Sequence, residues 1–138
     1  LRDFKKEDVF MAKTYEEIQK YKEQLKKQQS TWSCLEYASK MYQFVTGTGP
    51  AGANDSFEYW EKASADERYM HALAPSVPIW FNKTGHAGFI EKIDSNGKIY
   101  YSDANGLVKN KIESIVFSDS SKLGKKYENF KGYVKRKR

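Results

Sequence analysis

The sequence predicts an α+β fold in which helices come first and an antiparallel sheet follows. In the first half of the chain, apolar residues recur every three to four positions, as on one face of a helix. After Pro75 the pattern changes to the alternation that is typical of strands. Ser95, Asn96 and Gly97 lie between two such runs and form a hairpin-turn signal. Helices followed by strands indicate an α+β layout.

The expected helices span residues 14–29, 34–45 and 55–73, the last as one or two helices. Thr14 and Glu17 have the spacing of a capping box at the start of the first helix. Serine or threonine in 30–33 can cap the second helix, whose apolar residues form a single stripe. Residues 47–54 form a glycine-containing loop that lacks the GK[ST] ending of a phosphate-binding loop.

The expected strands span residues 77–82, 86–93, 97–103, 110–117 and 130–136. The second and third form a hairpin around the Asn96-Gly97 turn, and the whole set is expected to form an antiparallel meander.

A length of 138 residues suits one domain, and 39% hydrophobic residues provide enough apolar surface for a core. We assign residues 11–138 to this domain and residues 1–10 to an N-terminal extension or linker, because Met11 is a possible natural start. The single cysteine excludes an internal disulfide. Residues 1–17 are charged where a signal peptide needs an apolar region, and no apolar run is long enough to span a membrane.

The formal net charge of +6 favours polyanionic partners, which include nucleic acid, anionic lipid and cell-wall polymers. Charge alone does not choose among these partners.

Cys34 is the expected first residue of the second helix. Free backbone N–H groups and the helix dipole favour a thiolate there, so the thiol pKa is expected to fall below about 8.5. The same N–H groups can hold the oxyanion of a tetrahedral intermediate. The alternative is that Cys34 is only a small buried apolar residue.

His86 begins one strand of the expected hairpin, and Asp103 and Asn105 stand at the end of the other. The short turn brings these two ends side by side. His86 can then act as a general base, Asp103 can accept a hydrogen bond from its far nitrogen, and Asn105 can orient the ring. The alternative is a satisfied strand-end histidine beside turn-forming residues. The other histidine, His71, is interpreted as structural, within the 55–73 helix.

No metal site and no cofactor are expected. Two histidines and one cysteine, widely spaced, do not form a zinc pattern. Residues 54–61, NDSFEYWE, lack the alternating acidic oxygens and central glycine of a calcium loop.

Two stretches resemble one known family. They are GHAGFIEKIDSNGKIYYSDANG, residues 85–106, and WSCLEYA, residues 32–38. Together they are similar to the CHAP domain, the cysteine- and histidine-dependent amidohydrolase/peptidase module of bacteriophage endolysins and bacterial autolysins. The resemblance covers about 11–136, and MAKTYEEIQ at 11–19 also looks like the opening of some phage lysins.

The resemblance implies a papain-like fold, with helices packed on an antiparallel sheet. It implies Cys34 as nucleophile and His86 as base, and it places Asp103 and Asn105 at the family's acidic and asparagine positions. The implied reaction is cleavage of a peptidoglycan amide, by an N-acetylmuramoyl-L-alanine amidase or a peptide-bridge endopeptidase. A monomer is implied, either alone or attached to a wall-binding domain, made in the cytoplasm and released or delivered to the wall.

The sequence also departs from the family pattern. Asp103 replaces the commoner glutamate, and Gly106 stands where many members have an aromatic residue. The region before Cys34 lacks the Asp- and Gly-rich approach of many phage members, which leaves calcium dependence open.

Further candidates are Gln28 as an oxyanion donor, and Trp32, Trp80 and Tyr101 as groove-lining or core residues.

Two other functions fit parts of the sequence. An antibacterial toxin would use the same papain-like amidase chemistry in a different biological setting. A non-enzymatic module for nucleic acid or another anionic polymer would account for the +6 charge, but not for the Cys-His-Asp-Asn arrangement. We therefore expect a peptidoglycan substrate, no nucleic-acid partner and no insertion into a membrane.

Overall fold

The computed structural model describes residues 13–48 and 53–136. The proposed extension, 1–10, therefore lies outside the described residues. The elements are α2 (Tyr15–Gln28), α3 (Cys34–Thr46), α4 (Ser56–Lys62), the 3-10 helix η1 (Ala65–Glu67), β1 (Arg68–Tyr69), β2 (Val77–Trp80), β3 (His86–Ala87), β4 (Phe89–Ile93), β5 (Ile99–Ala104), β6 (Ile112–Phe117), α5 (Ser120–Gly124) and β7 (Phe130–Val134). This order of helices and antiparallel strands confirms the α+β class.

The first two helices begin where their caps predict. The Thr14 hydroxyl accepts from the Glu17 N–H, and the Glu17 carboxylate accepts from the Thr14 N–H, which confirms the capping box. Ser33 and Glu36 make the same reciprocal pair at the start of α3. The caps therefore fix the first residue of α3 as Cys34.

The expected helical region 55–73 contains α4 and the short 3-10 helix η1, and the expectation of helix is wrong beyond Glu67. Arg68 and Tyr69 instead pair with β7 as strand β1, so tertiary strand pairing replaces helical bonding there. The Arg68 guanidinium also donates to the Trp60 carbonyl at the end of α4. His71 consequently lies in an exposed irregular segment rather than in a helix.

The expected meander is only partly correct, because the strands form two sheets. One sheet has the order β4-β5-β6 and is a true meander. The other has the order β1-β7-β2-β3, so the last strand returns to pair with β2 rather than with β6.

The expected strand 86–93 divides at Gly88 into β3, which pairs with β2, and β4, which pairs with β5. The reason is a close approach of Tyr101: a Cβ on Gly88 would lie within 2.3–2.5 Å of the Tyr101 ring and hydroxyl. The Gly88 N–H donates to the Pro78 carbonyl and so leaves the β4-β5 ladder. The chain thus changes sheets two residues after His86.

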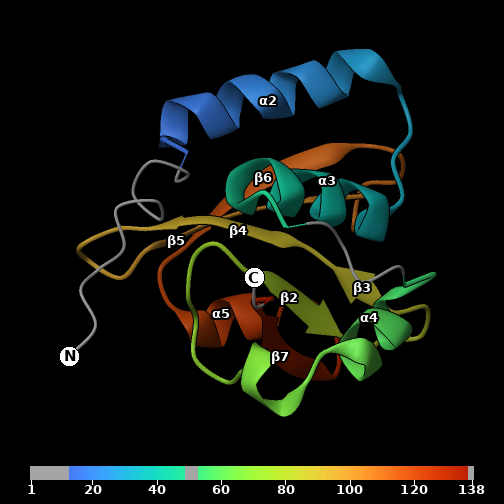
Figure 1. Ribbon diagram of the computed structural model, residues 1–138, viewed down its shortest axis with the longest axis vertical. Helices are drawn as coiled ribbons and strands as arrows, with labels where there is room; N and C mark the ends of the chain where they lie inside the picture. Colours follow the sequence, from blue (N-terminus) through green and yellow to red (C-terminus); the bar gives the residue numbers. More distant parts are fainter. Residues whose placement is uncertain (1–12, 49–52, 137–138) are drawn as a thin grey trace.

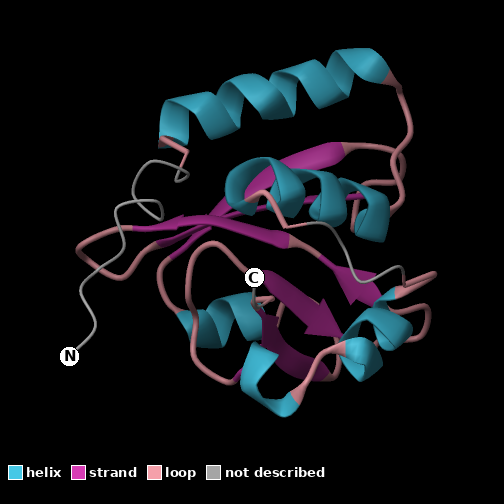
Figure 2. Ribbon diagram, in the orientation of Figure 1, coloured by secondary structure: helices cyan, strands magenta, loops and turns pink. Residues whose placement is uncertain are grey.

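Figure 1 shows α2 at the top, α3 below it, β4 and β5 across the middle, and α4, α5, β2 and β7 beneath. Figure 2 shows the same layering, with helices on both sides of the strands. The buried residues divide accordingly into two clusters. One joins α2 and α3 to the sheets, and the other joins β5 to α5, β2 and β7. The β4-β5-β6 sheet is therefore covered on both faces.

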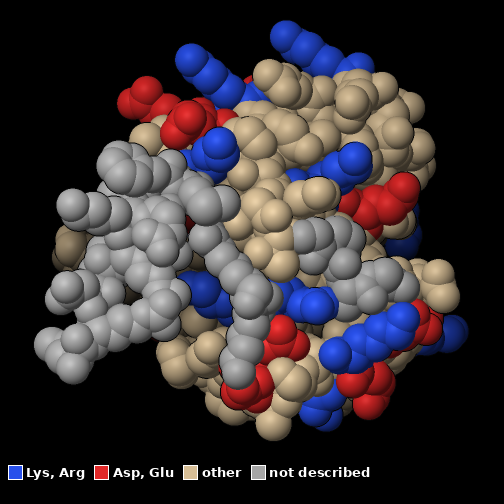
Figure 3. Space-filling view, in the orientation of Figure 1, with Lys and Arg blue, Asp and Glu red and all other residues tan. Residues whose placement is uncertain are grey.

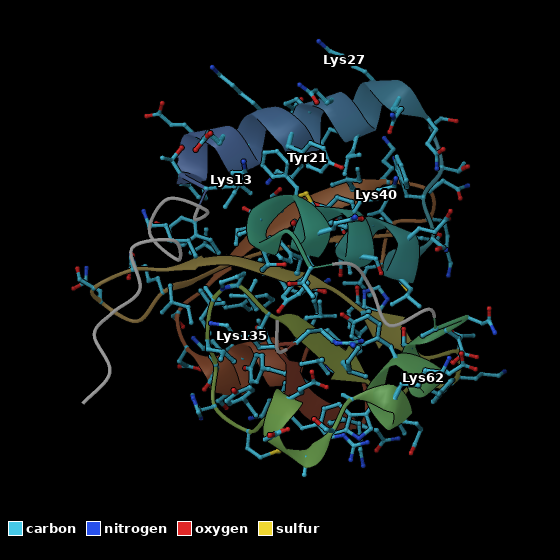
Figure 4. The ribbon with its side chains drawn as sticks, viewed as in Figure 1. Lys13, Tyr21, Lys27, Lys40, Lys62 and Lys135 are labelled. Carbon is cyan, nitrogen blue, oxygen red and sulfur yellow. The ribbon has the colours of Figure 1, made fainter. Side chains whose placement is uncertain are left out.

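Helix α2 is held by aromatic contacts, which include Tyr15 with Tyr100 and Tyr21 with Phe44, and by a buried ion pair. Tyr21 stacks on Phe44 of α3 with ring centroids 4.1 Å apart, and Figure 4 shows Tyr21 directed from α2 toward α3. Lys22 Nζ lies 2.9 Å from Glu91 Oε2 on β4, with both side chains nearly fully buried. None of the helices in the described ranges has the length and apolar character required to cross a membrane.

We predict that Gly88→Ala will lower the free energy of unfolding by about 1–3 kcal/mol, because the added methyl group displaces the Tyr101 side chain. Urea denaturation followed by circular dichroism measures this loss. Gly124→Ala is the matched control, since its Cβ would meet Phe130 at an ordinary 3.4 Å. Equal stability of the two variants would contradict the packing role of Gly88.

Candidate active site

Cys34 is the first residue of α3 and is partly exposed. Its backbone N–H belongs to the first helical turn, where amides have no acceptor within the helix. The Ser33-Glu36 capping box holds this turn in place. The sulfur is therefore attached to a fixed point, beside amides that can stabilise a negative charge.

His86 lies on β3, at the edge of its sheet, and its side chain is 5% exposed. The ring packs near Trp80 and against Tyr127, with centroids 5.8 and 4.3 Å away. It hydrogen-bonds to Asp103 and lies close enough to Cys34 for each of these two groups to shift the pKa of the other. The imidazole thus joins the helix start to the hairpin end.

Asp103 is fully buried and uses one oxygen for all its partners. Its Oδ2 accepts from His86 Nε2 at 2.9 Å, from the Tyr101 hydroxyl at 2.5 Å and from the Tyr127 hydroxyl at 2.9 Å. Lys126 Nζ lies 3.8 Å from the same oxygen. Because an ionised carboxylate cannot donate, the proton in the first bond belongs to Nε2, which leaves Nδ1 for the thiol of Cys34.

The site is assembled from both faces of the β4-β5-β6 sheet. On β5, Ser102 faces α3, where its hydroxyl meets that of Tyr37 at 2.6 Å. Asp103 and Tyr101 point to the opposite face, since strand side chains alternate. The change of sheets at Gly88 brings His86 to a position that reaches Asp103 on one side and Cys34 on the other.

Burial raises the pKa of the Cys34 thiol and is the largest single influence on it. It is outweighed by the hydrogen bond and positive charge of His86, by the backbone N–H of Ala87 and by the Ser56 hydroxyl, so the thiol pKa is lowered. Ser56 Oγ lies 3.9 Å from the sulfur, at the first residue of α4. The surroundings therefore favour a thiolate.

Burial lowers the pKa of His86, but its bonds to Asp103 and Cys34 raise it above the usual histidine value. For Asp103, burial raises the pKa, while the bond to His86 and the contacts with Tyr101 and Lys126 lower it. Asp103 therefore stays ionised and supports a positive charge on the ring.

The structure places Cys34, His86 and Asp103 together, but Asn105 stands apart from them. Asn105 adopts φ 52°, and its side-chain oxygen accepts from the Asn110 N–H at 3.1 Å. Its backbone N–H donates to the Lys111 carbonyl at 3.0 Å. Asn105 thus shapes the β5-β6 turn, and no bond to His86 is present among the described residues.

The remaining residues that the sequence suggested for the site are Gln28 and three aromatic residues, Trp32, Trp80 and Tyr101. Gln28 is an exposed residue at the end of α2. Trp32 is buried and donates to the Leu25 carbonyl, while Trp80 is buried and donates to the Gly124 carbonyl. Tyr101 is buried beside Asp103. Trp80 and Tyr101 therefore belong to the core, whereas Trp32 is largely buried but also lines a surface pocket with Lys26 and Asn110.

Three residues around the site, Ser56, Lys126 and Tyr127, were not predicted from the sequence, and Tyr101 was a candidate only for groove lining or core packing. Tyr101 lies two positions before Asp103 in the same strand, so the two side chains point to the same face of the sheet. This spacing was the one local signal in the sequence that Tyr101 lies beside Asp103. Ser56, Lys126 and Tyr127 arrive from distant segments and carry no such signal. Tyr127 reaches Asp103 only because residue 106 is glycine: a Cβ there would lie 2.1 Å from the tyrosine hydroxyl.

No group of three or more His, Cys, Asp and Glu side chains suited to a metal occurs in the part of the chain that the structure describes.

No family model, no curated protein and no solved structure matches this chain.

We predict that Cys34 reacts with iodoacetamide well below pH 8.5, because its pKa is lowered by His86. At pH 6.5 the wild type should react about tenfold or more faster than His86→Ala, which loses the hydrogen bond and charge of His86, the largest of the influences that lower the thiol pKa. Mass spectrometry follows the reaction, and no other thiol competes because the chain has one cysteine. His71→Ala is the matched control and should react like the wild type. Equal rates for all three proteins would show that His86 does not activate the sulfur.

Proposed function

We propose that this chain is a cysteine hydrolase with a papain-like arrangement, and that it cleaves an amide bond of bacterial peptidoglycan. One observation carries the proposal: the His86 ring bonds the buried Asp103 carboxylate and lies beside the Cys34 thiol at a helix start, where each shifts the pKa of the other. A nucleophile, a base and a group that orients the base are the parts that acyl transfer requires.

The first half of the reaction forms a thioester. His86 Nδ1 takes the thiol proton, and the Cys34 sulfur attacks the amide carbonyl carbon. The oxyanion lies toward the Cys34 N–H and the positive end of α3. His86 then gives its proton to the leaving nitrogen as the C–N bond breaks, and the amine departs.

The second half uses water. His86 Nδ1 takes a proton from a water molecule, whose oxygen attacks the thioester carbonyl. The C–S bond breaks, a carboxylic acid leaves, and the proton returns to the sulfur. Asp103 keeps the Nε2 proton in place and supports the positive charge that forms on the ring in both halves.

Peptidoglycan as the substrate rests on the resemblance of residues 32–38 and 85–106 to CHAP domains. The charge of the chain fits this choice, since Gram-positive walls carry anionic polymers. Figure 3 shows Lys and Arg interspersed with Asp and Glu on the face in view. Attraction to an anionic wall would therefore come from the net charge of +6 rather than from a concentrated basic patch on this face.

We predict that the protein clears suspensions of purified Gram-positive cell walls and that Cys34→Ala lowers the clearing rate about 1000-fold or more, because the nucleophile is lost. His86→Ala should cause a comparable loss, whereas His71→Ala should leave the rate unchanged, since His71 lies exposed outside the site. Turbidity at 600 nm measures the rate.

Mass spectrometry of the released fragments identifies the bond that is cut, since each cleavage leaves one new amine and one new carboxylate. Clearing that persists in Cys34→Ala would refute the assignment of this site, and salt-sensitive DNA binding by that variant would favour the binding-module alternative.

A further inference from the structure

Lys126 is a buried cation that the proposed reaction has not used. Its side chain is 4% exposed, and Nζ donates no hydrogen bond to any described residue. The nearest counter-charge is Asp103 Oδ2 at 3.8 Å. Nζ also lies 4.6 Å from the ring centroid of Tyr127 and 6.0 Å from that of Tyr101. A buried charge is costly unless it is compensated, so this lysine depends on the Asp103 carboxylate.

The position of Lys126 is fixed from outside the hairpin. Its backbone N–H donates to the Leu123 carbonyl at 3.0 Å, in the turn that follows α5. Downstream, Asn129 and Phe81 exchange backbone and side-chain bonds, which ties the end of this segment to β2. The segment thus delivers Lys126 and Tyr127 to Asp103 independently of β3 and β5.

Two cationic groups therefore face one carboxylate oxygen: protonated His86 at 2.9 Å and Lys126 at 3.8 Å. The more the carboxylate charge is shared with Lys126, the less it stabilises a proton on His86. The four groups Cys34, His86, Asp103 and Lys126 have zero total charge whether the proton is on sulfur or on the ring. Without Lys126 the same cluster would carry one negative charge.

Other titratable groups around this cluster come from separate elements. Cys34 faces His86 from α3, and the Tyr101 and Tyr127 hydroxyls donate to Asp103 from β5 and from the segment after α5. Glu113 lies opposite Asp103 in the β5-β6 register and acts electrostatically on Tyr127. Of the charged groups that the structure places within 4 Å of Asp103, Lys126 and His86 are the two cations.

We propose that Lys126 is a positioning residue that shares the charge of Asp103 and thereby keeps His86 acidic enough to release its proton to the leaving amine. This role rests on the proposed function, because only a proton-transferring histidine needs such a limit. A histidine held by an unshared buried carboxylate would form the ion pair with Cys34 readily but would protonate the leaving group poorly. Lys126 thus allows the His86 ring both to accept the proton of the Cys34 thiol and to give that proton to the leaving amine.

The test is an NMR titration of the His86 ring in the whole protein. Lys126→Met removes the charge and keeps the side-chain length, and it should move the His86 titration upward by roughly one pH unit, the size of shift that one nearby charge produces. Lys126→Arg keeps the charge and should stay close to the wild type. Lys125→Met is the matched control, because Lys125 is exposed on the adjacent position. His71, the other histidine, is an internal reference that should not move.

An unchanged His86 titration in Lys126→Met would overturn the inference, and so would an equal shift in Lys126→Arg. If Lys126→Met does not fold, Lys126→Gln removes the charge while still offering a hydrogen bond to Asp103, and the same shift is expected. The NMR titration of His86 does not require the protein to cleave a substrate. Failure of wall clearing by the wild type would therefore refute the proposed function, while the His86 shift would still decide the role of Lys126.

Discussion

The candidate site depends on one imidazole that bonds in two directions. His86 Nε2 meets a buried carboxylate at 2.9 Å, and the other ring nitrogen is left for the thiol. Neither contact suffices alone: without Asp103 the ring has no fixed tautomer, and without the ring the thiol loses the two largest of the influences that lower its pKa. This double contact in turn requires the chain to leave one sheet and enter the other at Gly88, because Cys34 and Asp103 approach from opposite faces.

Much of the helical layer was predictable because its signals are local. A capping box needs only residues three apart, so the starts of α2 and α3, and with them the position of Cys34, follow from Thr14 with Glu17 and from the serine at 33. The contact of His86 with Asp103 was also expected, since one short turn joins their strands. The α+β class followed from the change of periodicity after Pro75.

The remaining features depend on contacts between distant segments. The division of 86–93 into two strands follows from the Tyr101 ring lying over Gly88, which no alternating pattern reveals. The loss of helix after Glu67 follows from pairing with β7, more than sixty residues later in the chain. Asn105 has a sequence spacing that suits a site, but its left-handed backbone and its bond to Asn110 assign it to a turn.

The acid of this site is held in an unusual way for its short side chain. Asp103 is one methylene shorter than glutamate, yet Tyr101 and Tyr127 each donate to the oxygen that serves His86. The absence of a side chain at Gly106 provides the space for the Tyr127 hydroxyl. Asp103 and Gly106 are therefore coupled through one distant tyrosine, which helps to hold the carboxylate as an ionised partner for the ring.

The most direct measurement of this account is the protonation state of each His86 ring nitrogen, obtained from 15N chemical shifts across the pH range. The account predicts that Nε2 carries a proton at every pH at which the protein is folded, because Asp103 accepts from it, and that only Nδ1 titrates. A neutral ring with the proton on Nδ1 and a bare Nε2 would contradict it, because Asp103 would then not orient the base and Cys34 would face a nitrogen that cannot take its proton.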